Sequence, residues 1–213
     1  MLKRLIDFGA SLLGLVLLSP ILLVLAVLIR LDSSGPVFYR GVRAGRLGKP
    51  FRMIKFRTMV ANADRIGGPS SAGDDPRITR VGHFLRCYKL DEFPQLINVL
   101  RGEMSLVGPR PEVPEYAAMF NQEEARILGV RPGITDWASI WNSDEGALLA
   151  GSADPEKTYL EKIRPEKIRL QLKYVDNHSF WTDIRILSET IKILLLGRRS
   201  VPQLDVQSGG NDR

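Results

Sequence analysis

The feature that most constrains this chain is an uncharged apolar run from Phe8 to Ile29, close to the amino terminus. Its 22 residues would form a straight helix about 33 Å long, enough to cross the hydrocarbon core of a bilayer. A cleavable signal peptide would have a shorter apolar region followed by small residues, whereas Arg30, Leu31 and Asp32 follow this run. We therefore expect a retained membrane segment.

Ser19 and Pro20 interrupt this run near its middle. Proline removes one helical hydrogen bond and leaves the carbonyl of Val16 without its partner, which predicts a kink. The Ser19 hydroxyl is expected to bond back to the carbonyl of Leu15 and so ease the loss of hydrogen bonding inside hydrocarbon.

Both flanks of the run carry the positive charge that is typical of cytoplasmic segments. Lys3 and Arg4 precede it, and eight basic residues but only one acid lie between residues 30 and 57. A re-entrant helix, which bends at Ser19 and Pro20 and returns to the side that it entered, satisfies both flanks. A proline-kinked helix that crosses the membrane fully is the alternative.

The composition limits the partners of the rest of the chain. The 213 residues suffice for one globular unit, and 30 basic against 24 acidic residues give a net charge of +6, which suits nucleic acid, anionic lipid or a phosphorylated substrate. The single cysteine, Cys87, excludes an internal disulfide, and the two histidines, His83 and His178, lie far apart in sequence. We expect a reducing compartment and no zinc site.

The pattern along the chain predicts a mainly α fold with a short β-hairpin (α+β). We divide it into a membrane helix-break-helix at 1–32, a globular domain at 33–196 and a flexible tail at 197–213. The expected elements are an extended piece at 36–39, a loop or hairpin at 41–48, a strand at 51–59, a loop at 67–75, and helices at 80–90, 91–101, 113–129, 154–177 and 179–196.

The last predicted helix has an apolar face that could cover the core or lie on a membrane surface. Its members share helical spacing: Phe180, Trp181, Ile184, Leu187, Ile191 and Leu194. For a single helix of this kind we favour the core.

An acidic pair, Asp91 and Glu92, stands where this helical pattern starts again. Pro94 fits only the first turn of a helix, so the pair is expected at the amino end, where the helix dipole and free N–H groups keep Asp91 ionised. Two neighbouring carboxylates that face a diphosphate suit Mg²⁺, and the pair gives both candidate catalytic residues and candidate metal ligands. Alone the signal is weak, because a simple helix cap explains one of the two acids.

A set of basic residues within short motifs that contain proline, glycine or aromatic residues could grip phosphate oxygens. Its members are Lys55, Arg57, Arg86, Arg110 and Arg131. A basic surface attracted to anionic lipid is the alternative interpretation.

Several of these residues belong to motifs that occur in a fixed order, beginning with Ser19-Pro20. The others are Gly35-Pro36-Val37-Phe38-Tyr39-Arg40, Lys55-Phe56-Arg57-Thr58-Met59, Asp75-Pro76-Arg77-Ile78-Thr79, Leu90-Asp91-Glu92-Phe93-Pro94-Gln95-Leu96, Ser105-Leu106-Val107-Gly108-Pro109-Arg110-Pro111 and Arg131-Pro132-Gly133-Ile134-Thr135. With this order the chain resembles the bacterial sugar transferases, which are small monotopic phosphoglycosyl transferases, from residue 1 to residue 196.

The resemblance implies a two-step transfer. Asp91 would attack the β-phosphate of a UDP-sugar, release UMP and hold a covalent phosphosugar, which polyprenyl (undecaprenyl) phosphate then attacks. Glu92 would help to bind Mg²⁺, the turn Pro109-Arg110-Pro111 would hold the nucleotide, and the basic residues would line the phosphate site.

The resemblance also implies a setting. It favours the re-entrant helix, interfacial amphipathic helices, a catalytic domain on the cytoplasmic face of a bacterial inner membrane, the start of a cell-surface glycan, a possible homodimer and no nucleic acid. Two alternatives remain: a membrane-tethered anion-binding module in which Asp91 only caps a helix, and direct attack by the lipid phosphate without a covalent intermediate.

Three places depart from the pattern of that family. Asp136 stands where glycine is frequent after Gly133-Ile134-Thr135, Gln171 stands where an acid is frequent, and the stretch 143–146 is unusual. We expect these places to contact the sugar, so the sugar is not identified.

Overall fold

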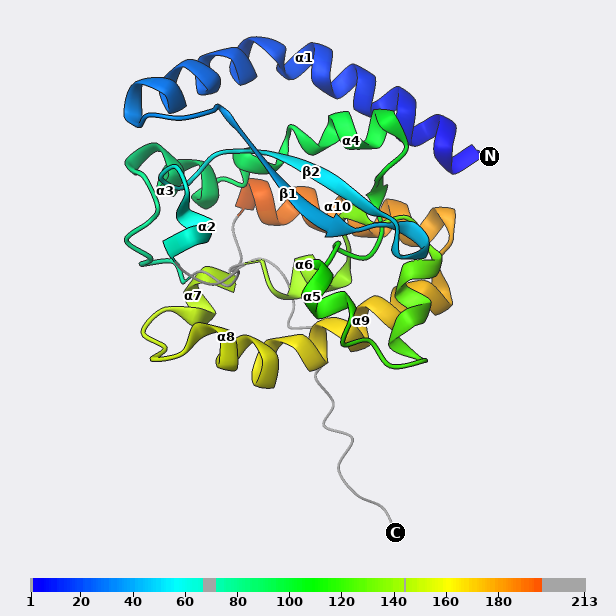
Figure 1. The fold of residues 1–213 in the computed structure, drawn as a ribbon. Helices are drawn as coiled ribbons and strands as arrows, with labels where there is room; N and C mark the ends of the chain where they lie inside the picture. The colour runs from blue at the N-terminus through cyan, green and yellow to red at the C-terminus, as the bar shows by residue number, and fades with distance from the viewer. Residues whose placement is uncertain (1, 67–71, 144, 197–213) are drawn as a thin grey trace.

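The computed structural model describes residues 2–66, 72–143 and 145–196. The predicted tail at 197–213 lies outside the described residues, as does part of the predicted loop at 67–75. Figure 1 shows a long amino-terminal helix above a mixed domain of short helices and small sheets.

The fold class predicted from the sequence, mainly α with a β-hairpin, is confirmed. The α-helices are α1 (Leu2–Asp32), α2 (Ala63–Ile66), α3 (Arg80–Cys87), α4 (Gln95–Arg101), α5 (Pro114–Ala117), α6 (Trp137–Trp141), α7 (Glu145–Leu149), α8 (Pro155–Thr158), α9 (Arg164–Asn177) and α10 (Phe180–Leu196). The strands are β1 (Phe38–Ala44), β2 (Pro50–Phe56), β3 (Ser105–Val107) and β4 (Gly133–Thr135). The 3₁₀ turns are η1 (Arg46–Gly48), η2 (Leu90–Glu92) and η3 (Glu124–Gly129), and η4 (Tyr159–Ile163) is a π-helical turn.

Helix α1 runs without interruption through Pro20. The Ser19 hydroxyl donates to the carbonyl of Val16 at 2.8 Å, not to Leu15 as predicted. Val16 lies four residues before Pro20, so its carbonyl is the one that proline leaves without an N–H partner. The serine satisfies it, and helical structure continues where the sequence predicted a break. The re-entrant course in a membrane stays a prediction.

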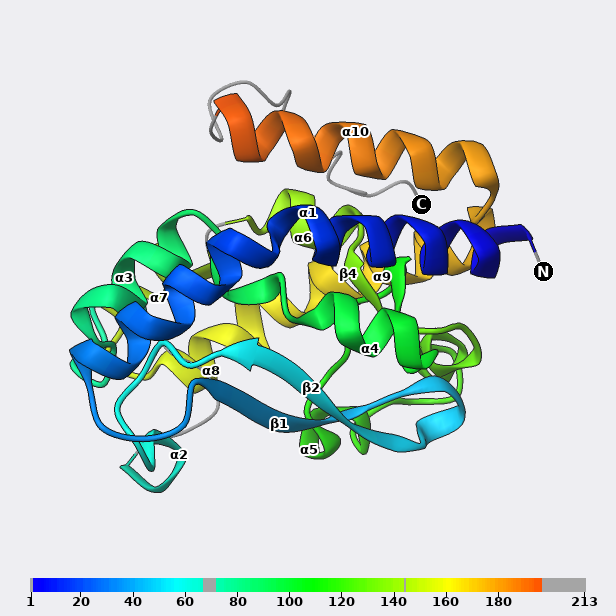
Figure 2. The ribbon, with the colours of Figure 1, turned by 90° about the horizontal axis from the view of Figure 1, so that it is seen from above.

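Both ends of α1 are bound to the same domain. Near the amino end, Arg4 donates to carbonyls in the last turn of α4, and the buried carboxylate of Asp7 accepts a hydrogen bond from the Ser105 hydroxyl at 2.8 Å. At the carboxyl end, Asp32 accepts a hydrogen bond from the backbone N–H of Val81 in the first turn of α3, at 3.0 Å. The long helix therefore lies along the domain, between α10 and the β1–β2 hairpin when seen from above (Figure 2).

Strands β1 and β2 form the predicted antiparallel hairpin. Its first strand continues through Gly41, in the stretch that the sequence assigned to a loop or hairpin, and the chain reverses at Gly48 with a φ of 71°. Phe51 and Met53 of β2 point into a core cluster with Val99 of α4, so the hairpin lies against that helix.

Strands β3 and β4 were not predicted. They pair in parallel, with Ser105 opposite Gly133. A Cβ atom on Gly133 would lie 2.1 Å from the backbone nitrogen of Gly108. The two chain segments can approach this closely because both residues are glycines. This contact joins two motifs that are far apart in sequence.

One helix prediction is wrong in part. The segment predicted as one helix at 113–129 holds only the short α5 and the turn η3. Between them the Asn121 side chain accepts hydrogen bonds from the N–H groups of Glu123 and Glu124, each at 2.9 Å. Such side-chain bonds offer the backbone an alternative to a continuous helix.

The core position predicted for the apolar face of α10 is also wrong. Five members of that face are exposed, with Trp181 at 76%. The side of α10 that packs against the domain carries Asp183, Ile186 and Ile193 instead. The membrane-surface interpretation, given above as the alternative, therefore fits α10 better.

Candidate active site

The acidic pair lies in the 3₁₀ turn η2, between α3 and α4. Lys89 enters this turn in the left-handed conformation with a φ of 56°, and α4 begins only at Gln95, with Pro94 as its cap residue. The pair thus precedes the helix by about a turn instead of capping it. Asp91 is buried and Glu92 is half-buried.

Two cations from separate elements contact this pair. The Lys55 ammonium, at the end of β2, donates to Glu92 Oε1 at 2.8 Å and lies 3.7 Å from Asp91 Oδ2. The Arg110 guanidinium, from the segment after β3, donates to both oxygens of Glu92. Such a two-point contact fixes the plane of the carboxylate as well as its position.

In this environment the pKa values of the two acids are shifted in opposite directions. Burial alone would raise the pKa of Glu92, but the charges of Arg110 and Lys55 outweigh it and hold that pKa well below the usual range. Burial raises the pKa of Asp91, and the charge of Lys55 offsets this only in part while the neighbouring charge of Glu92 adds to it. The sequence predicted that Asp91 stands at the amino end of the helix, and this is wrong because it lies in the turn before α4. That Asp91 is ionised stays a prediction.

Arg86 forms a third basic side of the site. Its Nε donates to the Thr58 hydroxyl at 2.9 Å, and its positive charge acts on Asp91. Gly82 lets α3 approach this strand end, since a Cβ there would lie 2.0 Å from the Thr58 carbonyl oxygen. Burial lowers the pKa of Arg86, and the charges of Asp91 and Asp75 offset this in part.

The other two predicted phosphate ligands lie elsewhere. The Arg57 guanidinium is directed at the end of α1, where it donates to the carbonyls of Ser33, Ser34 and Pro36 at 2.6–2.9 Å. Arg131 donates to the carbonyl of Gly102 at 3.0 Å. Their contacts are those of residues that hold chain segments together, and a phosphate-binding role for either is not supported by this geometry.

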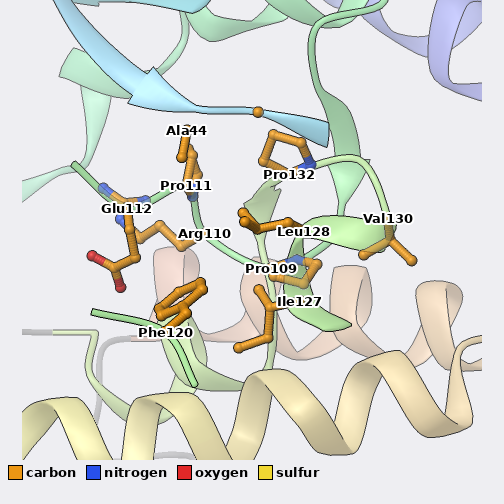
Figure 3. Close-up of a pocket in the computed structure, with 11 residues that line it drawn as sticks. Ala44, Pro109, Arg110, Pro111, Glu112, Phe120, Ile127, Leu128, Val130 and Pro132 are labelled. Carbon is orange, nitrogen blue, oxygen red and sulfur yellow. The ribbon is translucent and has the colours of Figure 1, made fainter. Parts of the chain in front are cut away.

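The turn Pro109-Arg110-Pro111 borders a small apolar hollow of about 10 Å³ beside Phe120 and Ile127 (Figure 3). This volume is that of about one water molecule and does not hold a uracil ring. The predicted contact of the turn with a nucleotide stays a prediction.

A buried network beneath this turn was missed by the sequence reasoning. The Lys167 ammonium lies 2.6 Å from Glu112 Oε1 and 2.9 Å from the Tyr159 hydroxyl, to which it donates. Burial would lower the pKa of Lys167, but the charges of Glu112, Tyr159 and Glu145 together with the hydrogen bond to Glu112 outweigh it, so that pKa is raised. In the sequence, the available signal for this network was a lysine beside the apolar residues Ile168 and Leu170.

The pair is chemically suited to Mg²⁺. Magnesium takes oxygen ligands and usually only one or two protein carboxylates, with water and substrate phosphates in its other positions. Across 2–66, 72–143 and 145–196, no cluster of three or more Asp, Glu, His or Cys residues exists to bind a metal more fully. Asp91 has the freer oxygens, because those of Glu92 already accept from Lys55 and Arg110.

The comparison with protein families identifies the family of the chain. The family model described as bacterial sugar transferase matches residues 1–197. The chain belongs to the bacterial sugar transferase family.

Individual members of this family are similar over most of the chain. A UDP-N-acetylgalactosamine-undecaprenyl-phosphate N-acetylgalactosaminephosphotransferase of Aeromonas hydrophila is 37% identical over 92% of the chain, which covers 44% of that protein. A UDP-glucose:undecaprenyl-phosphate glucose-1-phosphate transferase of Caulobacter vibrioides is 38% identical over 91% of the chain and 69% of that protein. An uncharacterized sugar transferase, EpsL, of Bacillus subtilis is 39% identical over 92% of the chain and 88% of that protein. The sugars in the first two names differ, so similarity does not identify the sugar.

Proposed function

We propose that this protein transfers a sugar 1-phosphate from a UDP-sugar to undecaprenyl phosphate and so starts the synthesis of a cell-surface glycan. The observation that carries the proposal is the buried pair Asp91 and Glu92, held by Lys55 and Arg110 within a bacterial sugar transferase. The names of its relatives supply the acceptor and the type of donor.

The reaction proceeds in two steps on Asp91. A carboxylate oxygen of Asp91 attacks the β-phosphorus of the UDP-sugar, the bond from that phosphorus to the bridging oxygen breaks, and UMP leaves with the electron pair. An oxygen of undecaprenyl phosphate then attacks the phosphorus of the Asp91 phosphosugar. The bond to Asp91 breaks, the carboxylate is regenerated, and a lipid diphosphate sugar is formed.

The surrounding cations have distinct roles in these steps. Lys55 lies against both acids, so it favours the ionised nucleophile and can donate to a phosphate oxygen that approaches Asp91. Arg110 fixes Glu92 through its two-point contact. Arg86 adds positive charge near Asp91, where the attacked phosphate would accumulate negative charge.

Asp91 and Glu92 would hold the magnesium ion. When bound, Mg²⁺ would act as a Lewis acid that neutralises the charge of the diphosphate, and it would also orient the diphosphate. An oxygen of Asp91 would remain available for attack, and the contacts of Glu92 with Lys55 and Arg110 would have to loosen for Glu92 to share in metal binding.

A seat at the membrane follows from α1. Among the described residues, α1 is the helix long and apolar enough to cross a bilayer, and most of its apolar side chains are exposed. The contacts of Arg4 and Asp32 tie its two ends to one domain, which supports a monotopic seat over a helix that leaves the domain to cross. On this basis, and on the basic flanks, the domain faces the cytoplasm.

The test is release of UMP from a panel of UDP-sugars by the detergent-solubilised protein with Mg²⁺ and undecaprenyl phosphate. We expect release that is lost on chelation of Mg²⁺ and in Asp91→Asn, and a trapped phosphosugar on Asp91 when the acceptor is omitted. Release without an adduct would favour direct attack by the lipid phosphate. No release from any sugar would favour an anion-binding module instead.

A further inference from the structure

Two fully buried side chains outside the acidic pair contact the backbone of Arg110. Asp136 Oδ2 accepts a hydrogen bond from the N–H of Arg110 at 3.1 Å, and Gln171 Nε2 donates to its carbonyl oxygen at 3.1 Å. Asp136 lies between β4 and α6, whereas Gln171 lies in α9, which packs against α6. Two elements distant in sequence therefore meet on one residue, whose guanidinium binds Glu92.

The rest of this turn leaves Arg110 little freedom. Proline on both sides restricts the backbone, Pro109 accepts a hydrogen bond from Gly133, and Gly108 donates one to Thr135. Arg110 thus carries the N–H and the carbonyl at the centre of the turn. Both are bound by buried side chains.

The placement of a carboxylate at position 136 needs a reason beyond helix capping. Asp136 Oδ1 accepts from the N–H and the hydroxyl of Ser139 at 2.6 and 2.7 Å, which is enough to cap α6. Serine or threonine would do this without the cost of burying a charge. The second oxygen, Oδ2, is directed at Arg110.

We propose that Asp136 and Gln171 are positioning residues that hold the backbone of Arg110 so that its guanidinium stays on Glu92. The inference rests on the proposed function for its catalytic consequence. The two positions are also two of the three departures noted in the sequence.

The first test separates the contact with Arg110 from the capping of α6. Asp136→Ser keeps a cap for α6 but is too short to reach Arg110 as well, and Gln171→Met removes the donor at similar volume. We expect each to lower kcat/KM for the UDP-sugar by about 10- to 100-fold, since displacement of a positioning group by about 1 Å has effects of this size. Ser139→Ala is the matched control, because it removes a bond to Asp136 without touching Arg110, and should stay within about twofold of wild type.

The second test asks whether the effect passes through Arg110. In an Arg110→Ala background, Asp136→Ser and Gln171→Met should cause no further loss of kcat/KM, because the group that they position is gone. Losses that multiply with that of Arg110→Ala, or an equal loss in Ser139→Ala, would overturn the proposal and indicate general damage to the fold.

The third test removes the donor at position 171 while keeping a polar side chain. Gln171→Glu faces the Arg110 carbonyl oxygen with a carboxylate, which accepts hydrogen bonds and does not donate, so it should lower both the Tm and kcat/KM. A loss as small as that of Ser139→Ala would contradict the role of Gln171.

A fourth measurement does not need activity, so it separates this inference from the proposed function. The Tm values of Glu92→Gln, Arg110→Ala and the double variant give the coupling of the two residues, first in the wild-type chain and then with Asp136→Ser. We expect the coupling to shrink by at least about half once Asp136 no longer holds the turn. An unchanged coupling would refute the positioning role even if no UDP-sugar is turned over.

Discussion

Replacement of Lys55 by methionine tests the electrostatics of the nucleophile most directly. The Lys55 ammonium lies 3.7 Å from Asp91 Oδ2, and both side chains are largely buried. At an effective dielectric constant of about 20, two unit charges at this separation attract by about 4 kcal/mol, equivalent to about 3 pKa units. Lys55 is shared with Glu92, and water will enter the space it leaves, so we expect Lys55→Met to raise the pKa of Asp91 further by about 1–2 units.

The direction of the pH effect follows from the chemistry. The ionised carboxylate is the nucleophile, and burial already raises the pKa of Asp91, so activity should fall as the pH falls through a value above the ordinary aspartate range. The assay is the pH profile of kcat/KM for UMP release, which reports groups of the free enzyme. In Lys55→Met the acidic limb of this profile should move to higher pH by about 1–2 pH units. At a fixed pH on that limb, kcat/KM should then be about tenfold lower for each pH unit by which the limb moves.

Two further variants make this result decisive. Lys55→Arg keeps the charge and should leave the limb near its wild-type position, and Lys49→Met removes an exposed lysine of the same hairpin and should change nothing. If Lys55→Met lowered the rate equally at all pH values, Lys55 would act on the substrate alone, and the reasoning about Asp91 would be refuted.

Other expected results follow from packing and burial. Gly133→Ala forces a Cβ to 2.1 Å from the Gly108 nitrogen and should abolish folded protein in a thermal melt or on size exclusion, whereas Gly129→Ala has free space and should behave as wild type. Asp91→Asn should raise the Tm at neutral pH while it abolishes turnover: the raised pKa means that the folded state binds a proton more tightly than the unfolded state, so stability is lost as the pH rises through that pKa. Trp181→Glu, on the exposed face of α10, should weaken flotation with anionic vesicles without a change in Tm; equal flotation would argue against α10 as a membrane-facing helix.

The sequence predicted the elements whose signals are local. The hairpin and helices α3, α4, α9 and α10 follow from apolar periodicity and from stops such as Gly102, which ends α4 with a φ of 82°. Strands β3 and β4 are three residues long and exist because two distant glycine-containing motifs meet. No local pattern encodes such a pairing, and it was missed.

The same limit applies to the site. Lys55 and Arg110 contact the acidic pair, whereas Arg57 carries an equally strong local signal and binds backbone carbonyls at the end of α1. A guanidinium binds carbonyls and phosphates through the same donors, so the residue type does not reveal its target. Asp136 and Gln171 appeared in the sequence as unrelated departures, and only the fold shows that they share Arg110.

The contacts of α1 link the membrane segment to the acidic pair through the two helices that flank it. Asp32 binds the first turn of α3, the helix that carries Arg86, and Arg4 binds the last turn of α4, the helix that follows Asp91 and Glu92. Polar contacts at both ends hold these helices at a fixed distance from α1, and an apolar cluster that includes Ile29 and Leu85 fills the space between α1 and α3. In the membrane seat proposed above, the depth of α1 would therefore set the height of the carboxylates above the lipid. This arrangement would suit the proposed nucleophile, which meets a soluble nucleotide sugar first and a lipid phosphate second, since neither substrate would have to leave its own phase.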